Sequence, residues 1–167
     1  MIAFLQNKNK QHFETELYNS HYKRIYNTCL RIVGNTMEAE EAMHDTFLKI
    51  FANYSKINDE KAFFAWSKSI AIRTSIDRIR KKKIYFESVE NLAIIDEEQI
   101  DENEIMFTVE KIKQKLVELA DGYRIILSMR LFENYSFEEI SDTLKIKESS
   151  VRSQYVRGKQ KLVQLLK

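Results

Sequence analysis

Residues 137–162 constrain the fold of this chain most strongly, because they predict two short amphipathic helices joined by a tight turn. The first helix carries apolar residues at helical spacing, namely Phe137, Ile140 and Leu144. Ser136 and Glu139 form an S-x-x-E capping box, which sets where that helix begins. The pattern lapses at 145–147. It resumes on one face of a second helix, at Val151, Tyr155 and Leu162. This arrangement is typical of a helix-turn-helix.

The outward face of the second helix is polar and basic. It carries Ser149, Ser150, Arg152, Ser153, Gln154, Arg157, Lys159 and Lys161, none of which is acidic. Such side chains can contact phosphates or base edges of DNA. A helical hairpin with a solvated basic face also occurs in proteins that never bind DNA, so this segment alone leaves DNA binding open.

Residues that form turns are scarce along the chain. Its 167 residues include no proline and three glycines, which favours an all-helical fold. Many helix-turn-helix turns place Gly after the first helix, whereas this chain has Lys145. A left-handed Lys145 would cost about 1 kcal/mol, which tertiary packing can absorb. The length suits one ordinary domain or two small ones. We predict an all-α fold of two small helical domains joined by an acidic linker.

Charge divides the chain into three parts. Residues 1–83 carry 15 basic and 9 acidic side chains, a net charge of +6. Residues 84–106 carry 8 acidic and no basic side chains, and residues 107–167 carry 12 basic and 8 acidic ones, a net charge of +4. This pattern indicates two modules that face nucleic acid and a connector with a different environment. The connector is either a solvated spacer or a mimic of a polyanion.

Apolar periodicity predicts the remaining helices. A long helix has Phe13, Leu17, Ile25, Cys29 and Val33 on one face and ends at Gly34. Thr36 begins a second helix, whose predicted inner face is Ala39, Met43, Phe47, Ile50 and Tyr54. Residues 52–61 read as a polar loop and 63–83 as a third helix. Further helices are predicted at 109–119 and 123–132, with a break at Asp121–Gly122.

Cys29 is the single cysteine, and its place on an apolar stripe predicts a small core residue rather than a redox group. No disulfide can form within the chain, which indicates a reducing compartment. No stretch approaches the length of a membrane span, and the N-terminus lacks a signal-peptide core. We therefore expect a cytoplasmic protein without direct membrane insertion.

Two surfaces of the predicted N-terminal helices carry candidate binding residues. The outer face of the second helix mixes acidic and apolar side chains, which fits either a solvated surface or a protein-docking face. The third helix ends in five basic residues within six positions, Arg78, Arg80, Lys81, Lys82 and Lys83. The helix dipole accounts for part of such a run. The excess favours a phosphate-binding patch.

Three ordered segments resemble the extracytoplasmic function (ECF) group of bacterial RNA polymerase sigma factors. Residues 39–51, AEEAMHDTFLKIF, resemble the stretch that docks on the clamp helices of the polymerase. Residues 62–83 resemble the helix that reads and melts the promoter −10 element, including the D-x-x-R at Asp77 and Arg80. Residues 119–166 resemble the domain that reads the −35 element.

The resemblance implies three parts and assigns a role to each group of candidate residues. Domain 2 would span 1–84, the acidic linker 85–106 and domain 4 107–167. The implied polymerase-binding residues are Glu38, Glu41, Asp45, Leu48 and Phe51. The residues implied for the pocket that holds an extruded base and for the −10 phosphates are Tyr54, Ser55, Lys56, Ile57, Asn58, Arg73, Asp77, Arg78, Arg80 and Lys81. Those implied for the −35 element are Ser149, Ser150, Arg152, Ser153, Gln154, Arg157 and Lys159.

The implied partners follow from the same resemblance. They are RNA polymerase core through its clamp helices and flap, double-stranded and non-template single-stranded promoter DNA, and an anti-sigma factor. The linker would run through the basic channel by which RNA leaves the polymerase. In the family an asparagine is common at the position of Arg73, which leaves the preference for the extruded base open. Trp66 and Phe63 are expected to pack in the core rather than to stack on bases.

Three other classes of protein remain to be weighed. A repressor or activator that binds DNA alone would not need the 39–51 segment or the acidic linker. A nucleic-acid enzyme is disfavoured, because His12, His21 and His44 show no metal-ligand spacing and no Gly-rich phosphate loop is present. We expect no cofactor, no metal and no catalytic residue. A structural adaptor would leave both basic helices unexplained.

Overall fold

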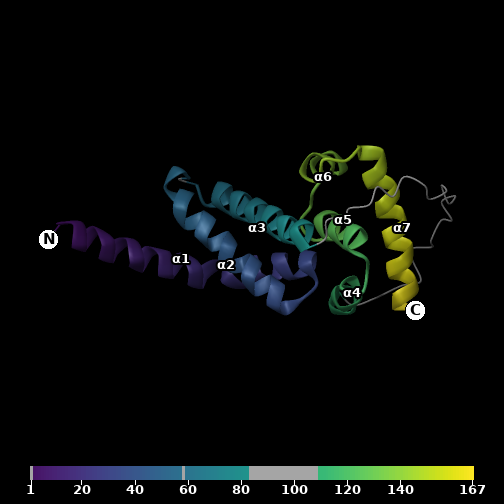
Figure 1. The fold of residues 1–167 in the computed structure, drawn as a ribbon, viewed down its shortest axis with the longest axis horizontal. Helices are drawn as coiled ribbons and strands as arrows, with labels where there is room; N and C mark the ends of the chain where they lie inside the picture. Colours follow the sequence, from purple (N-terminus) through teal and green to yellow (C-terminus); the bar gives the residue numbers. More distant parts are fainter. Residues whose placement is uncertain (1, 58, 83–108) are drawn as a thin grey trace.

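The computed structural model describes residues 2–57, 59–82 and 109–167, apart from the side chains of residues 2–8 and 56. The regular structure of these residues is helical, in agreement with the predicted all-α class (Figure 1). The elements are α1 (Ile2–Val33), α2 (Thr36–Asn53), the 3-10 turn η1 (Tyr54–Lys56), α3 (Glu60–Lys82), α4 (Val109–Leu116), α5 (Asp121–Leu131), α6 (Phe137–Leu144) and α7 (Glu148–Leu166). The predicted acidic linker, 85–106, lies outside the described residues.

Helices α1, α2 and α3 pack together as a three-helix bundle. Its core contains Ile25, Cys29, Ala39, Ala42, Met43, Phe47, Ile50 and Ala71. The predicted inner face of α2 is therefore confirmed, except that Tyr54 is half-buried after the helix has ended. Helix α1 starts at Ile2, earlier than its apolar stripe suggested, and Figure 1 shows that it projects past the α2–α3 hairpin.

The turn between α1 and α2 follows the predicted chemistry. Gly34 has a φ of +72°, in the left-handed region that glycine adopts without a Cβ clash. Asn35 precedes the first helical residue, Thr36, and its side chain accepts a hydrogen bond from the Glu38 amide at 3.2 Å. This N-cap satisfies one of the free amides at the start of α2.

The helix-turn-helix is formed by α6 and α7. Ser136 and Glu139 make both hydrogen bonds of the capping box, at 3.1 and 2.7 Å. Lys145 lies in the left-handed region, with φ 59° and ψ 39°, as the turn requires. The Ser141 hydroxyl donates to the Ile146 carbonyl at 2.6 Å across this turn. These contacts hold the turn in place despite the cost of a left-handed lysine.

The predicted break at Asp121–Gly122 was wrong by a few residues. Both residues lie in the first turn of α5, and the break falls between Leu116 and Asp121. An acidic side chain is favourable in the first helical turn, which explains why Asp121 begins α5 instead of ending the preceding helix.

The two groups of helices share one apolar core. Ile32 of α1 and Ile72, Ile76 and Ile79 of α3 form a cluster with residues of the C-terminal helices. Those C-terminal residues are Ile125, Ile126, Met129, Ile140, Leu144 and Val151. A second C-terminal cluster is formed by Leu116, Leu119, Leu127, Leu162 and Leu166. The C-terminal bundle therefore has a core of its own and also packs against the end of the N-terminal bundle.

Candidate functional site

The acidic face of α2 lies against Arg78 of α3. The Arg78 guanidinium donates to one Glu38 carboxylate oxygen at 3.2 and 3.3 Å and to Asp45 at 3.1 Å, and it also contacts Glu41. The three acids were predicted to bind a protein partner, and Arg78 was predicted to bind DNA phosphates. The structure brings these two predicted groups together, so the arginine offsets part of the negative charge of the three acids within the chain.

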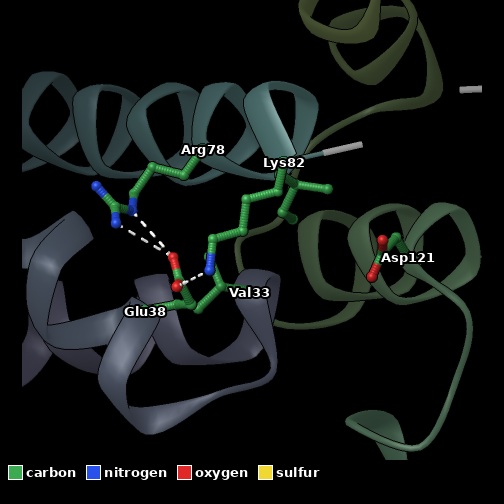
Figure 2. Close-up of a pocket in the computed structure, with 6 residues that line it drawn as sticks. Val33, Glu38, Arg78, Lys82 and Asp121 are labelled. Atoms are coloured by element: carbon green, nitrogen blue, oxygen red, sulfur yellow. Dashed lines mark hydrogen bonds and ion pairs between the residues drawn. The ribbon is translucent and has the colours of Figure 1, made fainter. Parts of the chain in front are cut away.

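Lys82 binds the same acidic face. Its ammonium contacts the second carboxylate oxygen of Glu38, so Arg78 and Lys82 converge on Glu38 from α3 (Figure 2). The hydrogen bond from Lys82, together with that from Arg78, lowers the pKa of Glu38 below its usual value. Glu38 is therefore ionised at neutral pH.

A small cavity of about 130 Å³ lies beside this ion cluster. Its lining residues are Val33, Glu38, Arg78, Ile79, Lys82 and Asp121. Figure 2 shows that Asp121 reaches the cavity from α5, whereas the other labelled residues come from the N-terminal bundle. The cavity thus marks where the two bundles meet, and it is smaller than the usual site for a drug-sized ligand.

The two apolar residues predicted for the polymerase-binding surface of α2, Leu48 and Phe51, differ in exposure. Leu48 is 68% exposed, whereas Phe51 is half-buried and packs near Phe47, with their ring centroids 5.7 Å apart. Met37, which was not among the predicted residues, is 69% exposed. Met37, Glu41, Asp45 and Leu48 recur at spacings of four, four and three, so they follow one face of the helix. We name these four residues the α2 docking stripe.

A larger cavity of about 560 Å³ opens beside the end of α2. Its lining residues are Lys49, Asn53, Ile57, Trp66 and Ile70. Tyr54, Ser55 and Ile57 are the residues predicted for a base pocket whose side chains the structure describes, and of these three Ile57 lines the cavity. The Tyr54 ring packs on the Phe13 ring, with their centroids 5.0 Å apart. Ser55 is exposed. The Lys56 side chain and Asn58 lie outside the described part of the chain.

Trp66 was predicted to pack in the core, and it contacts both the core and the larger cavity. It packs against the N-terminal core and lies near the Phe63 ring, 5.9 Å away, but it also lines the larger cavity. The sequence shows only that Trp66 and Ile70, four residues apart, share one face of α3, and it carries no signal of a cavity on that face.

The other residues predicted for the −10 element lie on α3. Arg73, Asp77 and Lys81 are exposed. Arg80 is half-buried, and its Nη2 donates to the Leu144 carbonyl of α6 at 2.9 Å. Arg80 therefore contacts the C-terminal bundle in this arrangement.

Helix α7 presents the predicted basic face outward. Val151 and Leu162 are buried, and Ser149, Arg152 and Ser153 are exposed. The half-exposed members of the face are Ser150, Gln154, Arg157 and Lys159.

Arg152 is held in place from two sides. It donates to Glu148 at 2.6 and 3.0 Å, and its guanidinium lies 4.6 Å from the Phe137 ring centroid. These contacts orient the arginine before any partner binds.

In the part of the chain that the structure describes, no helix is long and apolar enough to cross a membrane. Within the same residues no group of three or more His, Cys, Asp and Glu side chains could hold a metal ion.

Comparison with known families places two modules on this chain. A family model described as Sigma-70 region 2 matches residues 17–84. A second, described as Sigma-70, region 4, matches residues 110–162. The first covers most of α1–α3, and the second covers α4–α6 and most of α7.

Individual relatives and solved structures agree with these matches. The ECF RNA polymerase sigma factor SigW of Bacillus subtilis (strain 168) is 26% identical, over 93% of this chain and 89% of the relative. The ECF RNA polymerase sigma factor SigE of Mycolicibacterium smegmatis is 27% identical, over 88% of this chain and 59% of the relative. The sigma factor RpoE, solved in complex with the anti-sigma factor NepR from Bartonella quintana, aligns with a TM-score of 0.59 at 15% identity. That alignment covers 91% of this chain and 95% of the solved one.

Proposed function

This chain belongs to the ECF group of bacterial RNA polymerase sigma factors, which bind the polymerase and direct promoter recognition, and from this premise we propose how its surfaces divide the work. The α2 docking stripe binds polymerase core, the cavity beside Trp66 holds an extruded base of the −10 element, and α7 reads the −35 element. The corresponding division is domain 2 at 1–84, an acidic linker at 85–106 and domain 4 at 107–167.

The proposal for the α2 docking stripe is supported by its two exposed apolar side chains. Met37 and Leu48 are large, more than two-thirds exposed, and separated by acidic residues. An exposed apolar side chain among charged ones suits a protein interface in which charge selects the partner and apolar burial supplies affinity.

Arg78 is proposed as a positioning residue for this surface rather than as a phosphate contact. Its guanidinium lies between Glu38 and Asp45 and holds both carboxylates in place. Without it, three neighbouring acids would repel one another. The orientation of the acids, and therefore the affinity for polymerase core, should depend on this arginine.

Changing Arg78 to Ala is expected to weaken binding to polymerase core about five- to tenfold, the scale of a charge-assisted hydrogen bond. Titration of core with a fluorescently labelled chain measures this. Lys81→Ala is the matched control, because Lys81 is an exposed basic residue of the same helix end. If the two variants lose equal affinity for core and Arg78→Ala also flattens the salt dependence of DNA binding, Arg78 is a phosphate contact instead.

The base pocket is supported by the cavity beside the end of α2. Its volume of about 560 Å³ falls within the range of small-ligand sites. Trp66 is the aromatic residue of its lining, and stacking of a base on an aromatic ring contributes about 1–3 kcal/mol. Extruding a base costs a few kcal/mol, so a pocket of this kind can offset most of the cost.

Helix α7 is proposed to enter the major groove, and Arg157 tests this. Replacing Arg157 with Ala is expected to reduce transcription from −35-dependent promoters about tenfold, the effect of one lost base or phosphate contact. Run-off transcription with saturating core measures it. Lys167→Ala, at the exposed C-terminal residue, is the control. Transcript levels equal to those of the parent chain would remove Arg157 from the DNA-binding set.

The observation that carries this proposal is the combination of an exposed docking stripe on α2 with a solvent-facing helix-turn-helix on the same chain. In vitro transcription with core from the source organism, with and without the protein, tests it. Promoter-specific transcripts are expected only when the protein is present. Their absence on every chromosomal promoter tested would reject the proposed function.

Three further assignments follow from the family. An anti-sigma factor is proposed as a partner, because RpoE was solved with the anti-sigma factor NepR and CnrH with the cytosolic domain of CnrY. We assign the protein to the cytoplasm, where the polymerase acts, and regard it as an initiation factor rather than an enzyme. The linker at 85–106 is proposed to occupy the basic RNA exit channel of the polymerase.

A further inference from the structure

The first part of α1 lies outside the family match. The helix begins at Ile2, whereas the match to Sigma-70 region 2 begins at residue 17. Figure 1 shows this part of α1 running on past the α2–α3 hairpin. Its side chains at 9–16 are polar apart from Phe13, which is 45% exposed. A single exposed apolar side chain is ordinary on a protein surface, so its role is decided by what its ring contacts.

The Phe13 ring contacts the residue that follows α2. Phe13 packs on the Tyr54 ring, with the two centroids 5.0 Å apart and the planes tilted by 35°. Aromatic rings at centroid distances of about 4.5–7 Å attract one another beyond the apolar area that they bury. A second aromatic contact, between Tyr18 and Phe47 at 4.6 Å, ties α1 to the middle of α2. Phe13 therefore extends the attachment of α1 to the start of η1.

Tyr54 holds both the end of α2 and the turn after it. Its amide donates to the Ile50 carbonyl, which closes the last turn of α2. Its carbonyl accepts a hydrogen bond from the Ile57 amide at 3.1 Å, which closes η1. Ile57 has extended backbone, with φ −121° and ψ 118°, and lines the cavity of about 560 Å³ beside Trp66. One ring contact and one hydrogen bond therefore connect Phe13 to the wall of that cavity.

The turn itself is short and has no side-chain cap. It consists of three residues, and a 3-10 turn has poorer hydrogen-bond geometry than an α-helix. Asn53 precedes the turn without capping it, and its side-chain amide donates back to the Lys49 carbonyl at 3.1 Å. Ser55, in the middle of the turn, is exposed. The conformation of η1 therefore depends on how the Tyr54 side chain is packed.

Ile57 is the lining residue whose position depends most on this turn. The other four lining residues come from α2 and α3, and side chains on helices are held more precisely than those on loops. A pocket distinguishes bases only if its wall rejects the wrong ones, because a wall that adapts to every base binds all of them alike. The packing of Tyr54 thus bears on selectivity through Ile57.

We propose that Phe13 is a positioning residue for the base pocket: its ring holds Tyr54, and Tyr54 holds the turn that presents Ile57 to the extruded base. This inference rests on the proposed function and adds to it, because it makes a part of α1 outside the family match a determinant of −10 base preference. Core binding and −35 reading are separate from it, because neither the α2 docking stripe nor the polar face of α7 includes Phe13 or Tyr54.

Phe13→Ala tests the proposal through base selectivity. Run-off transcription with core and the full chain is measured on a promoter that the parent chain transcribes and on its single-base variants across the −10 element. Selectivity is the ratio of transcription with the best base to that with the second best, at the most selective position. It is expected to fall about threefold to tenfold, the scale of one lost aromatic pair.

His12→Ala is the matched control, because His12 is the exposed neighbour of Phe13 on the same helix. Its selectivity should stay within about twofold of the parent chain. Phe13→Tyr keeps the ring and should restore the parent selectivity, whereas Phe13→Leu keeps apolar area without the aromatic pair and should give an intermediate value. Circular dichroism checks that all four variants keep their helices.

Two outcomes of this series would overturn the proposal. In the first, Phe13→Ala lowers transcription equally on every −10 variant and leaves selectivity unchanged, which would mean that Phe13 contributes stability alone. In the second, Phe13→Tyr fails to restore selectivity, which would mean that the ring pair is not what matters.

A double-mutant cycle tests the route through Tyr54. Tyr54→Ala alone should reduce selectivity at least as much as Phe13→Ala does. Adding Phe13→Ala to it should then change selectivity by less than about twofold, because the contact is already lost. Two losses that multiply would show that Phe13 acts independently of Tyr54 and would reject the proposed route.

The inference and the proposed function fail in different ways. If the parent chain shows base selectivity in the −10 element and Phe13→Ala keeps all of it, the role of Phe13 is rejected and the base pocket stands. If the parent transcribes without a preference at any −10 position, the base pocket is rejected, and the role of Phe13 with it. If the parent supports no transcription with core, the proposed function itself is rejected together with this inference.

Discussion

Replacing Asp45 with Lys and Leu48 with Ala in one chain is expected to weaken binding to polymerase core about 100-fold, the effect of losing one interface hot spot. Leu48 is 68% exposed and is one of the two apolar side chains of the α2 docking stripe. A lysine at 45 would replace the carboxylate that binds Arg78 at 3.1 Å and would place like charges side by side. Affinity should therefore fall through lost apolar burial and through reversed charge.

Titration of core with labelled chain, read by fluorescence anisotropy, measures this loss. Glu40→Lys is the matched control, because Glu40 is an exposed acid on the same helix that lies outside the stripe. The control makes the same change of charge and should stay within about twofold of the parent chain. A double variant that binds core as tightly as the control would show that α2 does not dock.

Replacing Arg124 with Ala is expected to lower the free energy of unfolding by about 3–5 kcal/mol, the usual cost of breaking a buried charge network. Arg124 is 5% exposed. It donates to the carbonyls of Ile32 and Leu119 at 2.8 and 2.9 Å, and to Asp121 at 2.5 Å. Its removal takes a hydrogen-bond donor away from carbonyls at the end of α1 and from the Asp121 carboxylate at the start of α5.

Urea denaturation followed by circular dichroism measures this change. Arg124→Lys keeps the charge but cannot reach several acceptors from one planar group, so an intermediate loss is expected. Arg130→Ala is the control, because Arg130 is an exposed arginine of the same helix and surface changes usually stay within about 0.5 kcal/mol. A loss below about 1 kcal/mol for Arg124→Ala would mean that water replaces these contacts and that α5 does not complete α1.

Capping residues, turn residues and the spacing of apolar residues predicted most of the helices and their ends. The S-x-x-E box at Ser136 is present with both hydrogen bonds, and Lys145 takes the left-handed conformation that the turn demanded. Gly34 ends α1 with a positive φ. These features depend on residues a few positions apart, so they can be read from the chain itself. The same locality explains why Ala39, Phe47 and Ile50 were placed correctly on the buried face of α2.

The candidate sites were predicted less completely, because each depends on residues far apart in sequence. Arg78 was assigned to phosphates from its place in a basic run, whereas its partners lie on α2, 33 to 40 residues away. Trp66 was predicted to pack in the core, because the spacing of apolar residues predicts which face of a helix is buried. The same spacing does not predict a cavity beside that face. Met37 lies in the first turn of α2, where the spacing of apolar residues does not distinguish an exposed side chain from a buried one.

The order of side chains along the chain determined the all-helical class, the helix-turn-helix and the resemblance to a sigma factor, since all three follow from spacing within short segments. Only the tertiary structure decided that Arg124 and Glu133 meet the end of α1. Contacts between residues about 90 to 105 positions apart produce no periodic pattern in the sequence, because they depend on how the two folded bundles pack against each other.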